Sequence, residues 1–374
     1  MHTELLGIKA ADGVRRIVFF LAVTGCMVFL ICTPKKAVVS FLDVGQGDGI
    51  FIRTADGKVF LIDGGSTSKK NVGEKIIVPY LKYEGEKTVD VWFLTHEDED
   101  HINGFLQVLG EDEITIRAIA LPVTCRGDES EFWKVKHIAK ERGIPVLYLK
   151  EGDVIKSEAT GTAGADKDAG AKDGRNVRAG NEKKGGYEIR VLSPDAKGHY
   201  DDRNDASLVL LYECRKKCFG RELTEDIFLM GDSTAQGEEA VERYLALARR
   251  DAYSDIDTDK DEGNSAGKGK GADKGRDADS SITILKAAHH GSANNSNSED
   301  FIRKLSPDYA IISCGRNNVY GHPHKETLEY LGAAGSGVCR TDRQGYIRIC
   351  VSGRKIRVIP FCRQLLCLGI SFLY

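Results

Sequence analysis

The sequence carries almost no net charge. Its 53 lysines and arginines nearly balance 56 aspartates and glutamates, which leaves −3 over 374 residues at pH 7. No overall basic field therefore points to a nucleic-acid ligand, and any contact with a polyanion must come from a local patch. The length allows one large domain or two ordinary ones, with ample apolar content for a core.

The ten cysteines lack the paired Cys-x-x-Cys spacing of a structural zinc site. They are scattered along the chain, whereas an oxidising exterior would favour cleaner pairing, so the pattern fits a reducing or anaerobic setting better. Cys214 and Cys218 are close enough in sequence for a bridge or a hairpin clip. Spacing alone does not fix the pairing.

Two stretches have almost no large apolar residues. Residues 157–186 and 250–280 are mixtures of glycine, alanine, aspartate and lysine. Neither can bury enough surface to offset the entropic cost of ordering it, so we predict two disordered, solvated insertions. Their charges are mixed in sign, which disfavours a role as DNA-binding tails.

Residues 1–36 are predicted to form an N-terminal tail and a signal anchor or signal peptide. The apolar run at 17–33 follows Arg15 and Arg16 and has about the minimum length for a membrane span. An uncleaved anchor, the preferred interpretation, keeps the short basic tail inside and places the domain outside the cytoplasm. A cleaved signal would give a secreted protein. The apolar tail at 361–374 is too short for a confident span and has no assigned function.

Between these ends, residues 37–360 show hairpin signals first and then alternating strand and helix patterns. The predicted strands are 37–42, 50–53, 59–62, 89–94, 116–122, 146–149, 187–192, 208–212, 227–230, 282–288, 309–313, 347–351 and 355–359. The predicted helices are 73–83, 102–109, 131–142, 238–248, 301–305 and 326–331. This order predicts an α/β (α+β) domain of mixed sheets covered by helices.

The most informative stretch is Thr95 to His101, directly after the apolar run at 89–94. Within six residues it places four side chains that can bind a metal ion, namely His96, Asp98, Asp100 and His101. A loop that follows a buried strand can curl, so closely spaced ligands can converge on one point. An acidic solvated turn is the alternative, but the flanking strand and the later segments favour a metal site.

Other predicted strands also end in ionisable residues, namely Asp63, Asp232 and the pair His289 and His290. One such end alone would usually be a hydrogen-bonded turn, whereas the recurrence predicts a shared site at one sheet edge. Adjacent residues at a strand end point apart, so only one of the two histidines should face the site. The sequence leaves that choice open.

Taken together, these motifs resemble the metallo-β-lactamase fold superfamily, and within it the hydrolase domain of the ComEC family of DNA-uptake proteins. The resemblance rests on FLDVGQGD at 41–48, LIDGG at 61–65, THxDxDH at 95–101, NxxSLV at 204–209, GD at 231–232, HHGS at 289–292 and YGHP at 320–323. It spans 38–359 apart from the two insertions. The polytopic channel of full-length family members is absent from this sequence, so we expect a stand-alone relative with a single anchor.

The resemblance implies an αββα sandwich with two divalent metal ions at one edge of two packed sheets. His96 and Asp98 would hold one ion, Asp100 and His101 the other, and Asp232 would bridge them. One of His289 and His290 would complete the ligands. Three further carboxylates would hold the ligand side chains in place without binding the ions themselves: Asp43, Asp48 and Asp63.

Two departures from the superfamily pattern concern the ligands. Asp98 stands where the superfamily usually has a second histidine, as is typical of this subgroup, and the third motif at 204–207 offers no histidine. His199 lies nearby in sequence as a weak substitute. Oxygen-rich ligands favour Mn²⁺, with Zn²⁺ as the alternative. The same departures disfavour a β-lactamase, because they remove the zinc site that its chemistry uses.

The implied reaction is phosphodiester hydrolysis. Two cations would lower the pKa of a water, which would then attack phosphorus in line with the leaving group. Asp100 would orient this water and accept its proton, while His322 would reach the phosphate or protonate the leaving oxygen. Asn204, Ser207 and His324 are candidate phosphate-binding residues. The alternatives are a structural turn at 320–324 and ordinary strand-entry roles for the residues at 204 and 207.

The sequence therefore predicts a metal-dependent phosphodiesterase, and more narrowly a DNA nuclease connected with DNA uptake. Its partners would be DNA, a membrane through the N-terminal segment, and a separate channel protein. One alternative is the same chemistry on a cell-wall polymer or a choline-phosphate group. A third interpretation, a non-catalytic DNA-binding accessory, is supported by the weak third motif and opposed by the intact ligands at 96–101 and 232.

Overall fold

The computed structural model describes residues 17–25, 36–127, 132–157, 186–200, 202–218, 221–254, 280–352 and 355–360. The chain divides into two units, Met1–Lys36 and Ala37–Tyr374. In the first unit, residues 17–25 form a helix with mostly exposed side chains, and the rest of the predicted anchor lies outside the described residues. Among the described helices, none combines the length and the apolar character that crossing a membrane requires. The two predicted insertions fall almost entirely outside the described residues, as does the tail at 361–374.

The second unit contains two large mixed sheets. The first has the strand order β17-β16-β1-β2-β3-β5-β7-β8, and the second β15-β14-β13-β12-β11-β10-β9. The first sheet is formed by β1 (Val38–Phe41), β2 (Ile50–Arg53), β3 (Val59–Ile62), β5 (Val91–Phe93), β7 (Ile119–Pro122), β8 (Val146–Leu149), β16 (Ile347–Ser352) and β17 (Lys355–Pro360). The second is formed by β9 (Val154–Lys156), β10 (Tyr187–Ser193), β11 (Val209–Cys218), β12 (Arg221–Leu229), β13 (Ser280–Lys286), β14 (Tyr309–Ile312) and β15 (Gly337–Arg340). A short pair, β4 (Thr88–Val89) and β6 (Thr115–Ile116), stands apart from both.

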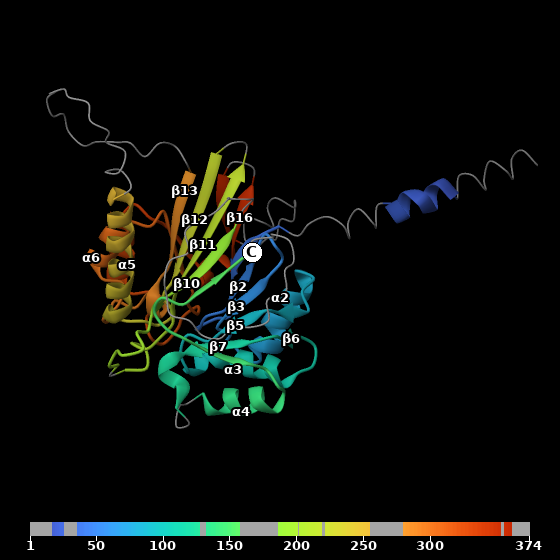
Figure 1. The fold of residues 1–374 in the computed structure, drawn as a ribbon, viewed down its shortest axis with the longest axis horizontal. Coiled ribbons are helices and arrows are strands. Elements are labelled where there is room, and N and C mark those ends of the chain that lie inside the picture. Colours follow the sequence, from blue (N-terminus) through green and yellow to red (C-terminus); the bar gives the residue numbers. More distant parts are fainter. Residues whose placement is uncertain are drawn as a thin grey trace, which may run out of the picture. The chain divides into compact units, whose positions relative to one another are not determined.

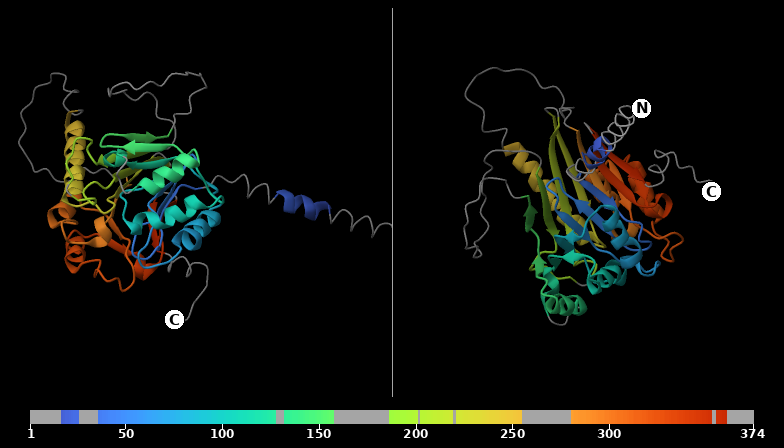
Figure 2. Two further views of the ribbon diagram at one scale, coloured as in Figure 1. Left: turned by 90° about the horizontal axis from the view of Figure 1, so that it is seen from below. Right: turned by 90° about the vertical axis from the view of Figure 1, so that its right-hand side faces the viewer.

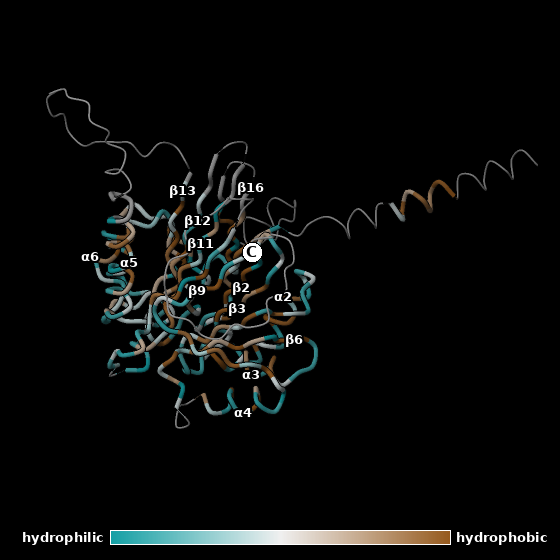
Figure 3. Tube along the Cα trace, in the orientation of Figure 1, coloured by the Kyte–Doolittle hydropathy of each residue, from teal (hydrophilic) through white to brown (hydrophobic). Residues whose placement is uncertain are grey.

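Helices cover the outer face of each sheet (Figures 1 and 2). A π-helical turn (Gly73–Ile77) leads into α2 (Val78–Tyr83), and with α3 (Glu99–Gly110) and α4 (Trp133–Glu141) it covers the first sheet. The second sheet is covered by α5 (Ala235–Ser254), α6 (Glu299–Leu305) and α7 (Lys325–Ala333), and α8 (Thr341–Gln344) follows β15. Apolar residues concentrate on the strands, whereas α4 is largely hydrophilic (Figure 3).

Three buried apolar clusters follow from the alternation of side chains along the strands. On β2, Phe51 packs toward the helices of the first layer, while Ile50 and Ile52 pack between the two sheets. The third cluster lies between the second sheet and its helices. Full burial of each large apolar side chain contributes roughly 1.5–3 kcal/mol, so both faces of each sheet add to stability. This arrangement of helix, sheet, sheet and helix confirms the predicted mixed α/β sandwich.

Several predicted element boundaries were wrong. Helix α3 begins at Glu99, three residues before the predicted start, so Asp100 and His101 lie in its first turn and not in a loop. Negative side chains are favourable at a helix N-terminus, which explains why this acidic stretch can be helical. The edge strands β9 and β15 were not predicted, and α5 continues to Ser254, into the predicted second insertion.

The suggested bridge between Cys214 and Cys218 is also wrong. Both residues lie on the single strand β11. Four residues of extended strand separate their Cα atoms by roughly 13 Å, whereas a disulfide requires less than about 7 Å.

A like-charge pair in the second sheet gives a testable pH dependence. Asp226 on β12 lies opposite Glu213 on β11, and burial together with Glu213 raises the pKa of Asp226 from 3.8 to about 6. The unfolded chain therefore loses this proton at lower pH than the folded chain, so stability falls as pH rises through that window. Asp226→Asn is expected to raise the free energy of unfolding by about 1 kcal/mol at pH 8. The gain should shrink toward pH 4 in urea titrations, and a gain that did not change with pH would contradict this account.

Candidate metal centre

The predicted ligands come together where strands of both sheets end. In the first sheet β3 and β5 are parallel, and in the second β12 and β13 are parallel, so each pair presents its carboxyl ends at one edge. The side chains that gather there are Asp63 after β3, His96 after β5, Asp100 and His101 on α3, Asp232 after β12 and His290 after β13.

His101 is held in one orientation by a buried chain of hydrogen bonds. Its Nδ1 lies 2.8 Å from Oδ2 of Asp63, and that carboxylate also accepts the N–H of Thr95 at 2.8 Å and its hydroxyl at 2.7 Å. Because Nδ1–H of His101 donates to this carboxylate, Nε2 of His101 remains available and faces Oδ1 of Asp232 at 3.2 Å. Asp63 therefore orients the ring of a candidate ligand, and its backbone is left-handed at φ 53°.

His96 is oriented by the same threonine. Its Nδ1 lies 3.1 Å from the hydroxyl of Thr95, which already donates its proton to Asp63, so His96 must be the donor. This leaves Nε2 of His96 buried without a hydrogen-bond partner among the described residues. Nε2 of His101 and Oδ1 of Asp232 are likewise buried without a hydrogen-bond partner among the described residues. Buried polar atoms that face one another without hydrogen bonds fit a site built for a cation.

Of the two adjacent histidines, the structure places His290 in the cluster. Its side chain is 2% exposed, and its Nε2 lies 3.2 Å from Asp100 Oδ2 and 3.4 Å from Asp232 Oδ2. Nδ1 donates to the carbonyl of Ser313 at 3.0 Å, which holds the ring so that Nε2 faces the carboxylates. The side chain of His289 is 31% exposed, and its Nε2 is 3.8 Å from Asp232. Both backbones are left-handed, with φ 46° and 55°, and this turn separates the two rings.

Among the described residues, four groups place ligand atoms within 4.8 Å of one another. They are His96, His101 and Asp232; Asp100, His101 and His290; Asp48, Asp232 and His290; and Asp48, Asp63 and His101. Asp98 is in none of the four. One of its oxygens lies 3.7 Å from His96 Nε2 and the other 3.3 Å from Arg203, so it stands at the margin of the cluster.

The charge distribution favours a cation at this point. Burial alone lowers the pKa of His101, but the carboxylates of Asp232 and Asp63 raise it well above its usual value. Conversely, burial raises the pKa of Asp232, yet the surrounding imidazoles hold it well below its usual range. The pKa of Asp100 falls to about 2, because the hydrogen bond to His290 and the neighbouring imidazoles outweigh its burial. A divalent ion and the imidazole protons therefore compete for the same nitrogens.

The other two carboxylates that were predicted to support the ligands, Asp48 and Asp43, form ion pairs with lysines. Asp48 is buried and forms an ion pair with Lys286, whose side chain is 0% exposed. Lys286 also donates to the carbonyl of Gly231 at 3.0 Å and lies 4.0 Å from Asp232. Asp43 pairs instead with Lys69 at 2.7 Å, so the structure gives no contact that supports its predicted role. Sequence reasoning missed Lys286, although a lone lysine inside an apolar strand was the available signal.

The third motif lies beside the cluster. The N–H of Leu208 donates to the carbonyl of Thr95 at 2.9 Å, which ties this segment to the end of β5. Oδ1 of Asn204 and Oγ of Ser207 are buried without hydrogen-bond partners among the described residues. His199 is exposed and belongs to none of the four groups, so it does not replace the missing histidine here.

His322 and His324 have different environments. Burial and the neighbouring histidines lower the pKa of His322 to about 4, so it is neutral at neutral pH. Its ring centre is 5.5 Å from that of His289 and 6.4 Å from that of His290. His324 uses Nδ1 to accept the N–H of Ala293 at 3.0 Å, so its predicted role as a phosphate contact gains no support.

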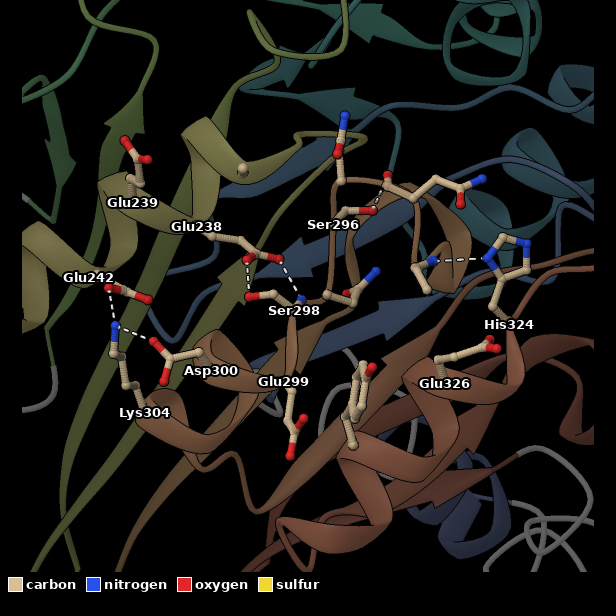
Figure 4. Close-up of a pocket in the computed structure, with 16 residues that line it drawn as sticks. Glu238, Glu239, Glu242, Ser296, Ser298, Glu299, Asp300, Lys304, His324 and Glu326 are labelled. Atoms are coloured by element: carbon tan, nitrogen blue, oxygen red, sulfur yellow. Dashed lines mark hydrogen bonds and ion pairs between the residues drawn. The ribbon is translucent and has the colours of Figure 1, made fainter.

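Cavities lie next to several of these side chains. One of about 590 Å³ opens at His96 and is lined also by Tyr200, Arg203 and Val123. A second of about 570 Å³ opens at His322. The third, of about 990 Å³, lies beyond His324 and is lined by carboxylates of α5, α6 and α7 (Figure 4).

Comparisons with known proteins agree with this geometry. Residues 42–174 match the model of the Metallo-beta-lactamase superfamily. ComE operon protein 3 of Bacillus subtilis (strain 168) is 29% identical over 334 residues, which is 85% of this chain and 33% of that protein. Competence protein ComA of Neisseria gonorrhoeae is 25% identical over 335 residues, 88% of this chain and 35% of that protein. The chain thus spans about a third of the length of these curated relatives.

A solved structure, the metallo-beta-lactamase fold protein YhfI from Bacillus subtilis, aligns over 87% of this chain and 100% of that one, with a TM-score of 0.41 and 11% identity. That likeness is too weak to carry an argument. The family model and the homologous competence proteins confirm the predicted resemblance. Residues 42–174 are thus similar to metallo-β-lactamase domains, a family whose fold implies divalent metal ions, and the clustered histidines and aspartates are candidate ligands.

Proposed function

We propose that this chain is a divalent-metal-dependent phosphodiesterase that cleaves DNA. The observation that carries the proposal is the convergence of buried, hydrogen-bond-free atoms of His96, His101 and Asp232 at the ends of strands from both sheets. The homology to proteins named for competence supports DNA as the substrate.

The candidate ligands would be enough to bind two ions. Asp100, His101 and His290 would hold one, while His96 and Asp98 would hold the other, and Asp232 reaches both groups. Bound divalent cations supply Lewis-acid stabilisation of phosphate oxygens and lower the pKa of water. Half of these six side chains are carboxylates, so we favour Mn²⁺, with Zn²⁺ as the alternative.

Other groups of the chain would orient the ligand rings, the attacking water and the phosphate. Asp63 and the Ser313 carbonyl fix the tautomers of His101 and His290, which keeps Nε2 of each ring directed at the cluster. Asp100 is ionised and would orient the attacking water by accepting a hydrogen bond from it. The neutral ring of His322 suits hydrogen bonding to a phosphate oxygen better than proton donation to the leaving oxygen. Asn204 and Ser207 offer further polar atoms on the side of His96.

The location and the partners are part of the proposal. The apolar N-terminal segment would anchor the protein in a membrane with its domain outside the cytoplasm, or direct its secretion if it is cleaved. A separate channel protein that supplies DNA transport is the proposed partner.

The test uses the full chain, purified in detergent, with fluorescent single- and double-stranded DNA and with Mn²⁺, Zn²⁺ or a chelator. Cleavage is expected only with metal, and Asp100→Ala should lower it about 100-fold or more. Metal binding without cleavage of either DNA would refute the nuclease. If DNA were bound but never cut, the accessory interpretation would take its place.

One observation favours a second candidate. The cavity at His96 has apolar walls from Pro122 and Val123 beside Tyr200 and would also admit a small headgroup. A choline-phosphate or cell-wall phosphodiester is therefore the competing substrate class. It would be preferred if such diesters were cleaved by the same ligands while DNA was left intact.

A further inference from the structure

A basic cavity lies beside the cluster of candidate metal ligands. Its volume is about 570 Å³, within the usual range for ligand sites. Three arginines contribute to its lining: Arg316 in the loop after β14, Arg340 at the end of β15, and Arg343 on α8. The only acidic residue among the lining residues is Asp342, so the side chains that line the cavity carry a net charge of +2.

The arginines are not neutralised equally. Arg340 is committed to Asp342, to which its Nε and Nη2 donate at 2.9 and 2.7 Å. Arg316 donates only Nε, to the carbonyl of Asp342 at 3.3 Å, and its terminal nitrogens have no carboxylate partner among the described residues. Arg343 is exposed and likewise has no ion pair within the described part of the chain. Two guanidinium groups are therefore left to bind an anion, and their planar forks match phosphate.

The cavity is physically joined to the reaction site through His322, which lines it. Asn318 ties the two together. Its Oδ1 accepts the N–H of His322 at 2.9 Å, and its Nδ2 donates to the carbonyls of His322 and Gly315 at 2.6 and 2.9 Å. The ring of His322 in turn lies next to His290 of the cluster. An anion bound by the arginines would thus be a near neighbour of a phosphate at the metal ligands.

The opposite charge lies on the other side of His324. The large cavity in Figure 4 is lined by six carboxylates, those of Glu238, Glu239, Glu242, Glu299, Asp300 and Glu326. Lys304 pairs with two of them, so the remaining charge is strongly negative. A polyanion would be repelled from this acidic cavity and attracted to the arginine cavity. The substrate should therefore extend from the metal ligands toward the arginines.

We infer that the arginine cavity binds a second phosphate of the substrate, next to the phosphate that is cleaved. This deepens the proposed function and rests on it. The substrate class is then a chain with successive phosphodiesters, such as a DNA strand, and not an isolated phosphodiester. Arg316 and Arg343 are substrate-binding residues remote from the reacting bond, so they should affect KM more than kcat.

The experiment compares two substrates on the full chain with Mn²⁺: a short fluorescent single-stranded oligonucleotide and bis-(p-nitrophenyl) phosphate, which has one phosphodiester. Arg316→Ala and Arg343→Ala should each raise KM for the oligonucleotide about tenfold and leave the single diester unchanged. The slope of log KM against log salt should become shallower by about 0.7 per lost contact. The matched control is Arg303→Ala on α6, which removes the same charge from a side chain elsewhere that is 71% exposed. This variant should leave KM unchanged for both substrates.

The outcomes separate the two proposals. If the single diester is cleaved but the arginine variants keep the wild-type KM for the oligonucleotide, this inference is overturned. The proposed phosphodiesterase activity would still hold. An equal loss on both substrates would also overturn it, because that pattern indicates a displaced His322 loop. If the wild-type protein cleaves neither substrate, the proposed function fails, and direct binding of the oligonucleotide still decides the inference. Arg316→Ala should then weaken binding about tenfold, and unchanged binding would refute it.

Discussion

Replacing His290 with alanine is expected to abolish metal-dependent activity, whereas the same change at His289 should leave most of it. The reason is position. Nε2 of His290 is within 3.4 Å of both Asp100 and Asp232 and its ring is buried, while the side chain of His289 is partly exposed and its Nε2 is 3.8 Å from Asp232. Loss of a ligand should cost at least the roughly 10–100-fold seen when residues that merely support ligands are changed.

The measurement is metal content per chain after dialysis, together with DNA cleavage across a metal titration. His290→Ala should bind fewer ions and show no recovery at moderate metal concentration. His289→Ala is the matched control, because it removes an identical side chain from the adjacent position. Equal losses in the two variants, or retention of full metal content by His290→Ala, would mean that the turn at 288–291 is arranged differently on metal binding.

Replacing Lys286 with methionine is expected to lower the free energy of unfolding by about 3–5 kcal/mol. Lys286 is fully buried, pairs with buried Asp48 and donates to the carbonyl that precedes Asp232. Burial lowers the pKa of this lysine, but Asp48 and Asp232 more than compensate and raise it, so it remains charged. Its removal leaves the Asp48 carboxylate buried without its partner, and that uncompensated charge is the main cost.

The double variant Lys286→Met with Asp48→Asn separates this explanation from a simple packing defect. Because it removes both charges, it should recover a large part of the lost stability. Unfolding should be followed in urea with a chelator present, so that altered metal affinity does not enter the comparison. If the double variant were as unstable as the single one, the charge pair would not be the cause.

Much of the site could be predicted from sequence because its information is local. His96, Asp98, Asp100 and His101 lie within six residues, and the continuous apolar runs at 59–62 and 227–230 place Asp63 and Asp232 just after strand ends. The same kind of continuous apolar run predicts the central strands, since each has two buried faces. It fails for β9 and β15, because short edge strands carry few apolar residues and no clear pattern.

Other features depend on contacts between distant segments. Asp48 and Asp43 look alike in the sequence, yet one is paired with a lysine 238 positions away and the other with Lys69 at the surface. The arginine cavity joins the loop after β14 to the end of β15 and α8, and no single motif contains it.

The sequence by itself determined the class of fold and the chemistry of the ligands, because side-chain periodicity and clustered ionisable residues are properties of neighbouring positions. Only the tertiary structure decided which of two adjacent histidines faces the cluster, which carboxylates support it and where positive charge gathers. Those outcomes depend on backbone turns and on packing between sheets, which bring together residues that the chain itself keeps far apart.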